Sequence, residues 1–178
     1  MSHTTFQSII ELKEMVIATF DIDHFTALTK NLDPVAVFSM INEIVTETEF
    51  QLEKSGGRLI KMIGDSALIT FPPEKIDQAV VLLFDLKSKL EEIAGRGRNK
   101  QSLSFSIHFG EVATGTMGKS GFFDIMGDAV NTAFRLIYGD QKRGRFAVSP
   151  QVFRKLKPET RKYFHKFTPP IVYFGELN

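Results

Sequence analysis

The chain has 178 residues, enough for one domain with a substantial core and short of two. With 43% hydrophobic residues, 24% charged residues and a net charge of +1, it shows no basis for a nucleic-acid surface or a polybasic membrane surface. There is no cysteine, so disulfides, thiolate metal sites and cysteine nucleophiles are excluded. No window approaches the roughly 18–20 apolar residues of a membrane span. The start also lacks a charged segment followed by an apolar one, so we expect a cytoplasmic domain over residues 1–178.

The N-terminal part is expected to hold a buried strand and a long helix. Residues 1–14 are a linker or contain a short helix over residues 6–12. Residues 15–20 form a continuous apolar run with β-branched side chains, which predicts a buried strand. Asp33 and Pro34 supply an N-cap and a first-turn proline. The helix that follows ends at Gly56 and Gly57, and its apolar face is predicted from the spacing of Val35, Phe38, Ile41, Val45 and Leu52.

The remaining elements are shorter and mix hairpins with helices. The patterns predict strands over 58–63 and 66–71 joined by a tight turn, a helix from about Val80 to Gly95, strands over 102–108 and 111–116 around Phe109-Gly110, a helix over 129–137, a strand over 146–148, a helix over 150–156 and two strands between 163 and 177. This order favours an α+β domain with a largely antiparallel sheet flanked by helices.

Two aspartates lie where predicted strands end. Asp21 follows the first buried strand, and Asp65 lies in the turn of the first hairpin. If that strand lies beside the hairpin, the two carboxylates can share hard cations such as Mg²⁺. On spacing alone, local turn hydrogen bonds are the better explanation. Asp23 is a third ligand or, as we expect, an exposed acid at a helix entry. His24 receives no role, and His108 is expected to be packed or hydrogen-bonded and not catalytic.

Residues 113–120 resemble a relaxed phosphate-binding loop with the ending Gly118-Lys119-Ser120. That motif requires a helix directly after it, so that backbone amides can surround phosphate. Here the next residues are glycine and two phenylalanines, which are not typical of a helix start. We therefore expect a hairpin tip or loop between two strands.

A further pair changes this assessment. Asn131 and Arg135 are four residues apart on a predicted helix, so they share one face. The pair can donate to a phosphate or, equally, make a hydrogen bond along the helix surface. Taken in order with the earlier motifs, they resemble the catalytic domains of class III adenylate and guanylate cyclases. The resemblance runs from about Val16 to Leu136 and rests on four segments: residues 20–26, 61–65, 107–118 and 123–136.

The resemblance implies a role for each matching position. Asp21 and Asp65, helped by the carbonyl of Ile22, would bind two Mg²⁺ or Mn²⁺ ions per site. Further positions would bind the nucleotide: Lys61 and Asp124 the purine, Asn131 the ribose, and Arg135 the phosphoryl group in its transition state. Guanylate cyclases of this family typically carry Glu and Cys or Ser where this chain has Lys61 and Asp124. The expected reaction is therefore ATP to 3′,5′-cyclic AMP and pyrophosphate.

Family members take their metal carboxylates from one chain and their purine, Asn and Arg groups from its partner. Since this chain carries both sets, the resemblance implies a head-to-tail homodimer that binds ATP, with no nucleic acid and no membrane contact of its own. The alternative is a non-catalytic cyclase-homology domain that binds nucleotide or mediates dimerisation. A diguanylate cyclase would require a Gly-Gly-acid-acid-Phe signature, which the sequence lacks.

Three positions depart from the family pattern. His24 stands where many relatives have glycine, and Phe134 stands where a small residue is common. The family's C-terminal Lys-Gly segment has no clear counterpart, and Lys166 is the candidate replacement for its triphosphate-binding lysine.

Overall fold

A single sheet organises the part of the chain that the structure describes. The structure is a computed structural model and describes residues 9–96, 101–138, 144–168 and 171–176. Its elements are β1 (Glu11–Ile22), α1 (Phe25–Thr29), α2 (Pro34–Leu52), β2 (Arg58–Ile63), β3 (Ser66–Phe71), a 3₁₀ turn (Pro73–Lys75), α3 (Ile76–Gly95), β4 (Leu103–Met117), β5 (Phe122–Met126), α4 (Asp128–Tyr138), β6 (Phe146–Val148), α5 (Pro150–Lys155), α6 (Pro158–Arg161), β7 (Phe164–Phe167) and β8 (Val172–Gly175). The eight strands lie in the order β2-β3-β1-β4-β6-β8-β7, with β5 paired to β4. Only the β4–β6 pair is parallel among these described strands, which confirms the predicted α+β class with a largely antiparallel sheet.

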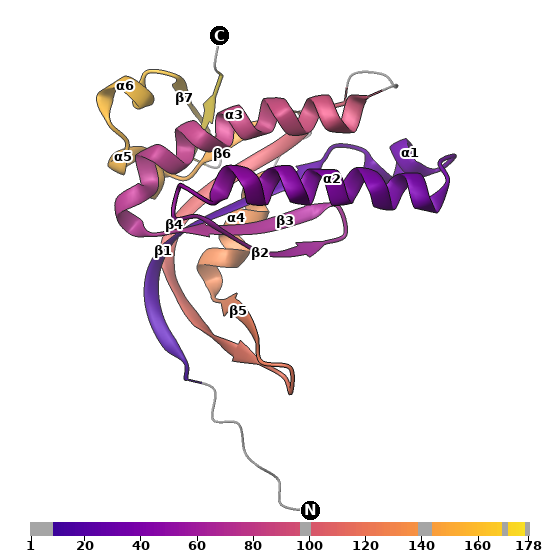
Figure 1. Ribbon diagram of the computed structural model, residues 1–178. Helices are drawn as coiled ribbons and strands as arrows, with labels where there is room; N and C mark the ends of the chain where they lie inside the picture. The colour runs from indigo at the N-terminus through magenta and orange to yellow at the C-terminus, as the bar shows by residue number, and fades with distance from the viewer. Residues whose placement is uncertain (1–8, 97–100, 139–143, 169–170, 177–178) are drawn as a thin grey trace, which may run out of the picture.

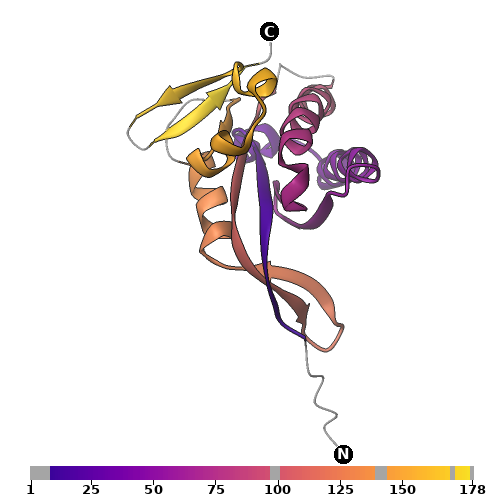
Figure 2. The same ribbon diagram turned by 90° about the vertical axis from the view of Figure 1, so that its left-hand side faces the viewer.

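Helices cover the two faces of this sheet unequally. The long helices α2 and α3 lie over one face, and α4 lies against the other (Figures 1 and 2). Aromatic rings dominate the larger core: Phe84 of α3 stacks on Phe146 with ring centroids 3.8 Å apart, and Phe105 lies 5.9 Å beyond. The smaller core packs Ala129 and Ala133 of α4 against the sheet. Strands β1 and β3 therefore contribute buried residues to a core on each face of the sheet.

The start of β1, the end of β4 and all of β5 project beyond the helices as a curved arm (Figures 1 and 2). Cross-strand register places Leu12 opposite Ala113, which is opposite Met126, so these side chains share one face of the arm. By the same alternation, Met117 and Phe122 lie on that face. The face is apolar and exposed, with Leu12 69% and Met126 54% accessible.

Two sequence expectations for strands and helices are wrong. Residues 9–12 are not helical, since Glu11 begins β1; residues 6–8 of the expected helix lie outside the described ranges. The strands expected on either side of Phe109-Gly110 are one continuous strand, β4. A Cβ at Gly110 would lie 2.9 Å from the Cβ of Ala129, so this glycine permits close approach of α4 instead of a turn.

The predicted helix α2 exists, but its buried face differs from the one expected. Val35 and Phe38 are 73% and 74% exposed, while the buried positions are Met40, Ile44, Thr48 and Leu52. The true stripe follows an i, i+4 spacing and includes a threonine whose hydroxyl donates to the Ile44 carbonyl at 2.7 Å. A polar residue inside this stripe obscured the pattern in the sequence.

Truncating phenylalanine at a buried and at an exposed position tests this placement of the core. Phe146→Ala should lower the free energy of unfolding by about 3–5 kcal/mol, because it empties the centre of the aromatic stack. Phe38→Ala should change it by less than about 0.5 kcal/mol. Urea denaturation of both variants measures the difference, and equal losses would contradict the burial assignment.

Candidate active site

The structure brings the two strand-end aspartates together. Asp21 is next to last in β1, which pairs with β3 from Val16↔Phe71 to Phe20↔Ala67, and Asp65 lies in the turn before β3. The Ser66 hydroxyl donates to Asp21, and the backbone N–H of Ile22 donates to Asp65. Ser66 was not identified from the sequence, because a serine at the start of a strand carries no distinguishing signal.

The two carboxyl groups perturb each other. Burial raises the pKa of Asp21, and the negative charge of Asp23 raises it further. Burial also raises the pKa of Asp65, followed by the charge of Asp21. Each carboxyl group therefore lies in an environment that disfavours its charged form.

This donor set fits a hard divalent cation. Both carboxyl groups are half-buried, and no Lys, Arg or His forms an ion pair with either of them within the described ranges. Carboxylate oxygens are the ligands that Mg²⁺ and Mn²⁺ prefer, and a bound cation would offset the repulsion between the two negative charges. The carbonyl of Ile22 lies on the same strand end.

Asp23 and His24 differ from expectation. Asp23 is neither a free third ligand nor a solvated acid, because its carboxylate accepts hydrogen bonds from Ser102, Ser104 and the backbone N–H of Gly144. His24 has φ 57°, the one positive φ outside glycine among the described residues. Glycine adopts a left-handed backbone without steric cost, so a histidine at this position strains the turn.

Lys61 and Asp124 form a direct ion pair between β2 and β5. The Lys61 Nζ lies 2.6 Å from Asp124 Oδ2, and the other carboxylate oxygen accepts from the backbone N–H of Ile125 at 2.8 Å. Asp124 is 5% exposed and Lys61 38% exposed, so the acid is fixed and the cation stays accessible. Asp124 also lines a groove of about 370 Å³ on the apolar face of the arm, beside Gly115 and Met126.

Asn131 and Arg135 are exposed on α4, as the helical spacing predicted. The Arg135 guanidinium bonds to the Thr132 hydroxyl at 2.9 Å and to Asp128 at 3.2 Å, so it is oriented along the helix surface. Ser106 of β4 donates to the Ala133 carbonyl at 2.5 Å and bonds to Thr19 of β1. This buried series of hydrogen bonds holds α4 against β1, the strand that carries Asp21. Sequence patterns did not predict it.

The remaining candidates lie apart from these groups. Lys166 is exposed on the edge strand β7, four strands from β1 in the sheet order. Lys119 lies in the turn between β4 and β5, which confirms the expected hairpin tip in place of a phosphate-binding loop. His108 is buried, as expected, and its burial lowers its pKa; its Nδ1 has no hydrogen-bond partner in the described part of the chain.

The chain resembles known proteins in sequence. The family model for the adenylate and guanylate cyclase catalytic domain matches residues 10–169. The chain belongs to this family. An adenylate cyclase of Anabaena cylindrica is 27% identical over 70% of this chain, and a receptor-type guanylate cyclase of Caenorhabditis elegans, gcy-23, is 30% identical over 65%. The chain spans only 27% and 12% of the lengths of these two relatives.

Solved structures agree with the fold of this cyclase domain. The adenylyl cyclase CyaB from P. aeruginosa superposes with a TM-score of 0.79 over 96% of this chain and 97% of its own, at 18% identity. At that identity the likeness concerns the fold, which has the same sheet flanked by helices. Separately, no helix in the described ranges has the length and apolarity needed to cross a bilayer.

Replacing Asp65 tests the electrostatic account of the carboxylate pair. A raised pKa means that the folded protein holds the proton more tightly than the unfolded chain, so folding stability falls as the pH rises through that pKa. At pH 7 without metal, Asp65→Asn should therefore raise Tm by about 1–2 °C, a small gain because partial exposure to solvent screens the repulsion. The gain should shrink as the pH falls and Asp65 becomes protonated in the wild type.

Differential scanning calorimetry with a chelator measures this effect. Asp85→Asn, on the exposed side of α3, is the matched control and should leave Tm nearly unchanged. Added Mn²⁺ should stabilise the wild type and not Asp65→Asn. Destabilisation of Asp65→Asn at pH 7 in chelator would contradict the proposed repulsion.

Proposed function

We propose that this cyclase domain converts ATP to 3′,5′-cyclic AMP and pyrophosphate. The observation that carries the choice of ATP is the ion pair of Lys61 and Asp124. It presents an amine donor beside a carboxylate acceptor, which matches N1 and the exocyclic amine on the edge of adenine. Guanine presents the opposite donor and acceptor order at these two atoms, so the same pair disfavours GTP. A cytoplasmic location follows as part of this proposal, because ATP is abundant there.

The groove beside Asp124 supports the purine assignment. Its volume of about 370 Å³ and its apolar walls from Ile10, Met117 and Met126 suit a flat aromatic base. Asp124 is the charged member of its lining and is oriented by the backbone N–H of Ile125. A base seated there would meet the fixed acid at one end of the groove.

Catalysis in this proposal rests on positioning and charge stabilisation. Asp21 and Asp65, with the Ile22 carbonyl, would hold Mg²⁺ or Mn²⁺, two per site. When bound, such ions activate the ribose 3′-hydroxyl and neutralise the triphosphate. Asn131 orients the ribose, and Arg135 offers its guanidinium to the charge that develops on the α-phosphoryl group. Lys166 is the proposed cation for the distal phosphates.

A head-to-tail homodimer would join these groups. Within one chain, no hydrogen bond or ion pair among the described residues links Asp21 or Asp65 to Lys61, Asn131 or Arg135. The arm also exposes an apolar face on which Phe122 is 53% accessible, and a partner chain would cover it. Two identical contacts of this kind close a dimer with two equivalent sites.

Complementation between inactive variants tests the shared site. Asp21→Ala should abolish turnover, and Arg135→Ala should lower kcat by roughly 10²–10³ through loss of one transition-state donor. Mixed in equal amounts, the two variants should regain about one quarter of wild-type activity, because half of the dimers are mixed and each mixed dimer has one intact site. Cyclic AMP formation measures the recovery.

The control for this experiment is Lys119→Ala at the hairpin tip. It should retain activity close to that of the wild type, whereas a phosphate-binding loop would lose activity with this lysine. Absence of recovery despite demonstrated subunit exchange would refute the shared-site model. Inactivity of the wild-type dimer itself would favour a non-catalytic cyclase-homology domain.

A further inference from the structure

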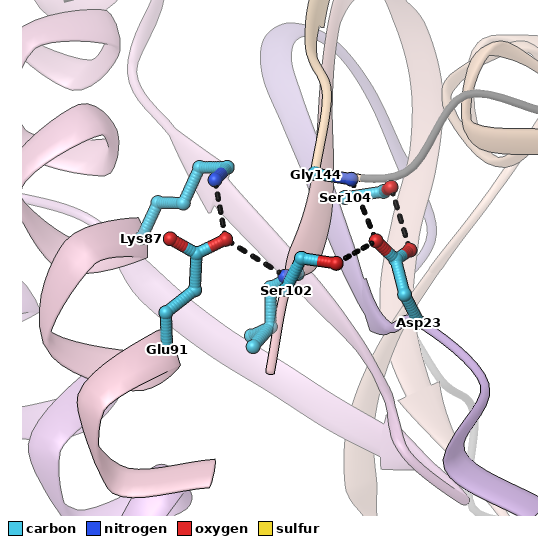
Figure 3. Close-up of polar contacts among 7 residues, drawn as sticks. Asp23, Lys87, Glu91, Ser102, Ser104 and Gly144 are labelled. Atoms are coloured by element: carbon cyan, nitrogen blue, oxygen red, sulfur yellow. Dashed lines mark hydrogen bonds and ion pairs between the residues drawn. The ribbon is translucent and has the colours of Figure 1, made fainter. Parts of the chain in front are cut away.

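Five hydrogen bonds converge on Asp23, directly after the strand end that carries Asp21. One carboxylate oxygen accepts from the Ser102 hydroxyl at 2.7 Å and from the Gly144 backbone N–H at 2.6 Å; the other accepts from the Ser104 hydroxyl at 2.7 Å. Its backbone N–H donates to the Ser102 carbonyl at 3.0 Å, and its carbonyl accepts from Gln101. Figure 3 shows the carboxylate enclosed by its three donors.

These contacts join separate parts of the fold. The β1–β4 ladder ends at the pair Ile22↔Leu103, so Asp23 binds β4 where the backbone ladder stops. Ser104 pairs with Asp21 across the ladder while its hydroxyl holds Asp23. Gly144 lies just before β6. The backbone carbonyl of the next residue, Arg145, accepts from the backbone N–H of Phe105 at 2.7 Å.

A second acid holds the same strand entry from the opposite side. Glu91 of α3 accepts from the backbone N–H of Leu103 at 2.9 Å and pairs with Lys87 at 2.5 Å (Figure 3). Glu91 anchors β4 to the helical layer, whereas Asp23 anchors the end of β1 to β4. The two acids therefore provide a matched comparison: both bind the start of β4, and only Asp23 belongs to the segment that carries Asp21.

The position of Asp23 opposes two local sources of instability. Asp21 and Asp65 repel each other when both are ionised, which favours separation of the end of β1 from the β2–β3 turn. His24, the next residue, has a left-handed backbone that disfavours side chains with a Cβ. A strained backbone of this kind persists only where the surrounding contacts hold it in place. The hydrogen bonds of Asp23 hold the residue directly before His24.

Electrostatics alone does not favour an acid at this position. The charge of Asp23 raises the pKa of Asp21, so it makes the pair harder to ionise. Both carboxylate oxygens already have donors, and ligating a metal would break those hydrogen bonds. The carboxylate acts as an anchor, because it accepts hydrogen bonds from three donors at once. One of these donors is a backbone N–H, which can only donate.

We propose that Asp23 is a positioning residue for the divalent-cation site, acting through the backbone of β1 on Asp21 and the Ile22 carbonyl. This inference rests on the proposed function. Groups that hold metal ligands in place typically contribute about 10–100-fold to metal affinity. Loss of the Asp23 contacts should therefore weaken cation binding by about 10-fold or more.

Mn²⁺ binding to the purified chain, measured by calorimetry and by the electron paramagnetic resonance of free Mn²⁺, tests this role without relying on turnover. Asp23→Ala removes the acceptor for the backbone N–H of Gly144 together with a charge. The double variant Ser102→Ala/Ser104→Ala keeps the charge and removes two donors. Glu91→Ala is the control that perturbs the same strand entry from α3.

Both Asp23→Ala and the double serine variant should bind Mn²⁺ about 10-fold more weakly than the wild type. Glu91→Ala should lower Tm and leave Mn²⁺ affinity within about twofold, because a general loss of stability does not displace Asp21. Unchanged Mn²⁺ affinity in the double serine variant would show that Asp23 acts by its charge alone. Tighter Mn²⁺ binding in that variant would show that Asp23 itself ligates the cation. Equal weakening in Glu91→Ala would reduce the effect to general loosening; each of these results overturns the inference.

Asp21→Ala provides the blank. If the wild type shows no Mn²⁺ binding that depends on Asp21, the metal role in the proposed function fails and this inference fails with it. If Asp21-dependent binding is present and the Asp23 and serine variants match the wild type, only the positioning role is refuted.

Discussion

Strand β1 is paired on both sides, and the placement of Asp21, Asp65 and Asp124 depends on this double pairing. Its second half lies between β3 and β4, with Ile17 opposite Thr70 on one side and His108 on the other. This register delivers Asp21 to the turn that holds Asp65. The first half of β1 pairs with the part of β4 that supports β5, and β5 carries Asp124. One strand thus connects the pair of Asp21 and Asp65 to the arm.

Local instability at the site is offset by packing beneath it. Asp21 and Asp65 both have raised pKa values. His24, three residues after Asp21, has a left-handed backbone conformation. The aromatic stack around Phe105 and Phe146 and the buried chain from Thr19 through Ser106 to Ala133 secure the sheet under them. Such a division is typical of functional sites, where unfavourable local electrostatics is retained for binding and the core supplies the stability.

Much of this arrangement could be predicted from the sequence, because apolar runs, caps and tight turns act locally. The α+β class, the hairpin around Asp65 and the α4 helix with Asn131 and Arg135 follow from such signals. Continuity of β4 through Gly110 could not be predicted, since a glycine admitted by close helix packing has the same sequence signature as a turn. The role of Asp23 depends on Ser102, Ser104 and Gly144, which are distant in the chain, and no local pattern reports such contacts.

The most direct test of the account is product formation by the purified chain with ATP or GTP and Mn²⁺, resolved by chromatography and mass, with Asp21→Ala as the blank. The account predicts 3′,5′-cyclic AMP and pyrophosphate from ATP, little cyclic GMP, and neither product in the blank. Preference for GTP would contradict the purine assignment of Lys61 and Asp124. Absence of any cyclic nucleotide, at protein concentrations where the dimer is demonstrated, would contradict the catalytic function itself.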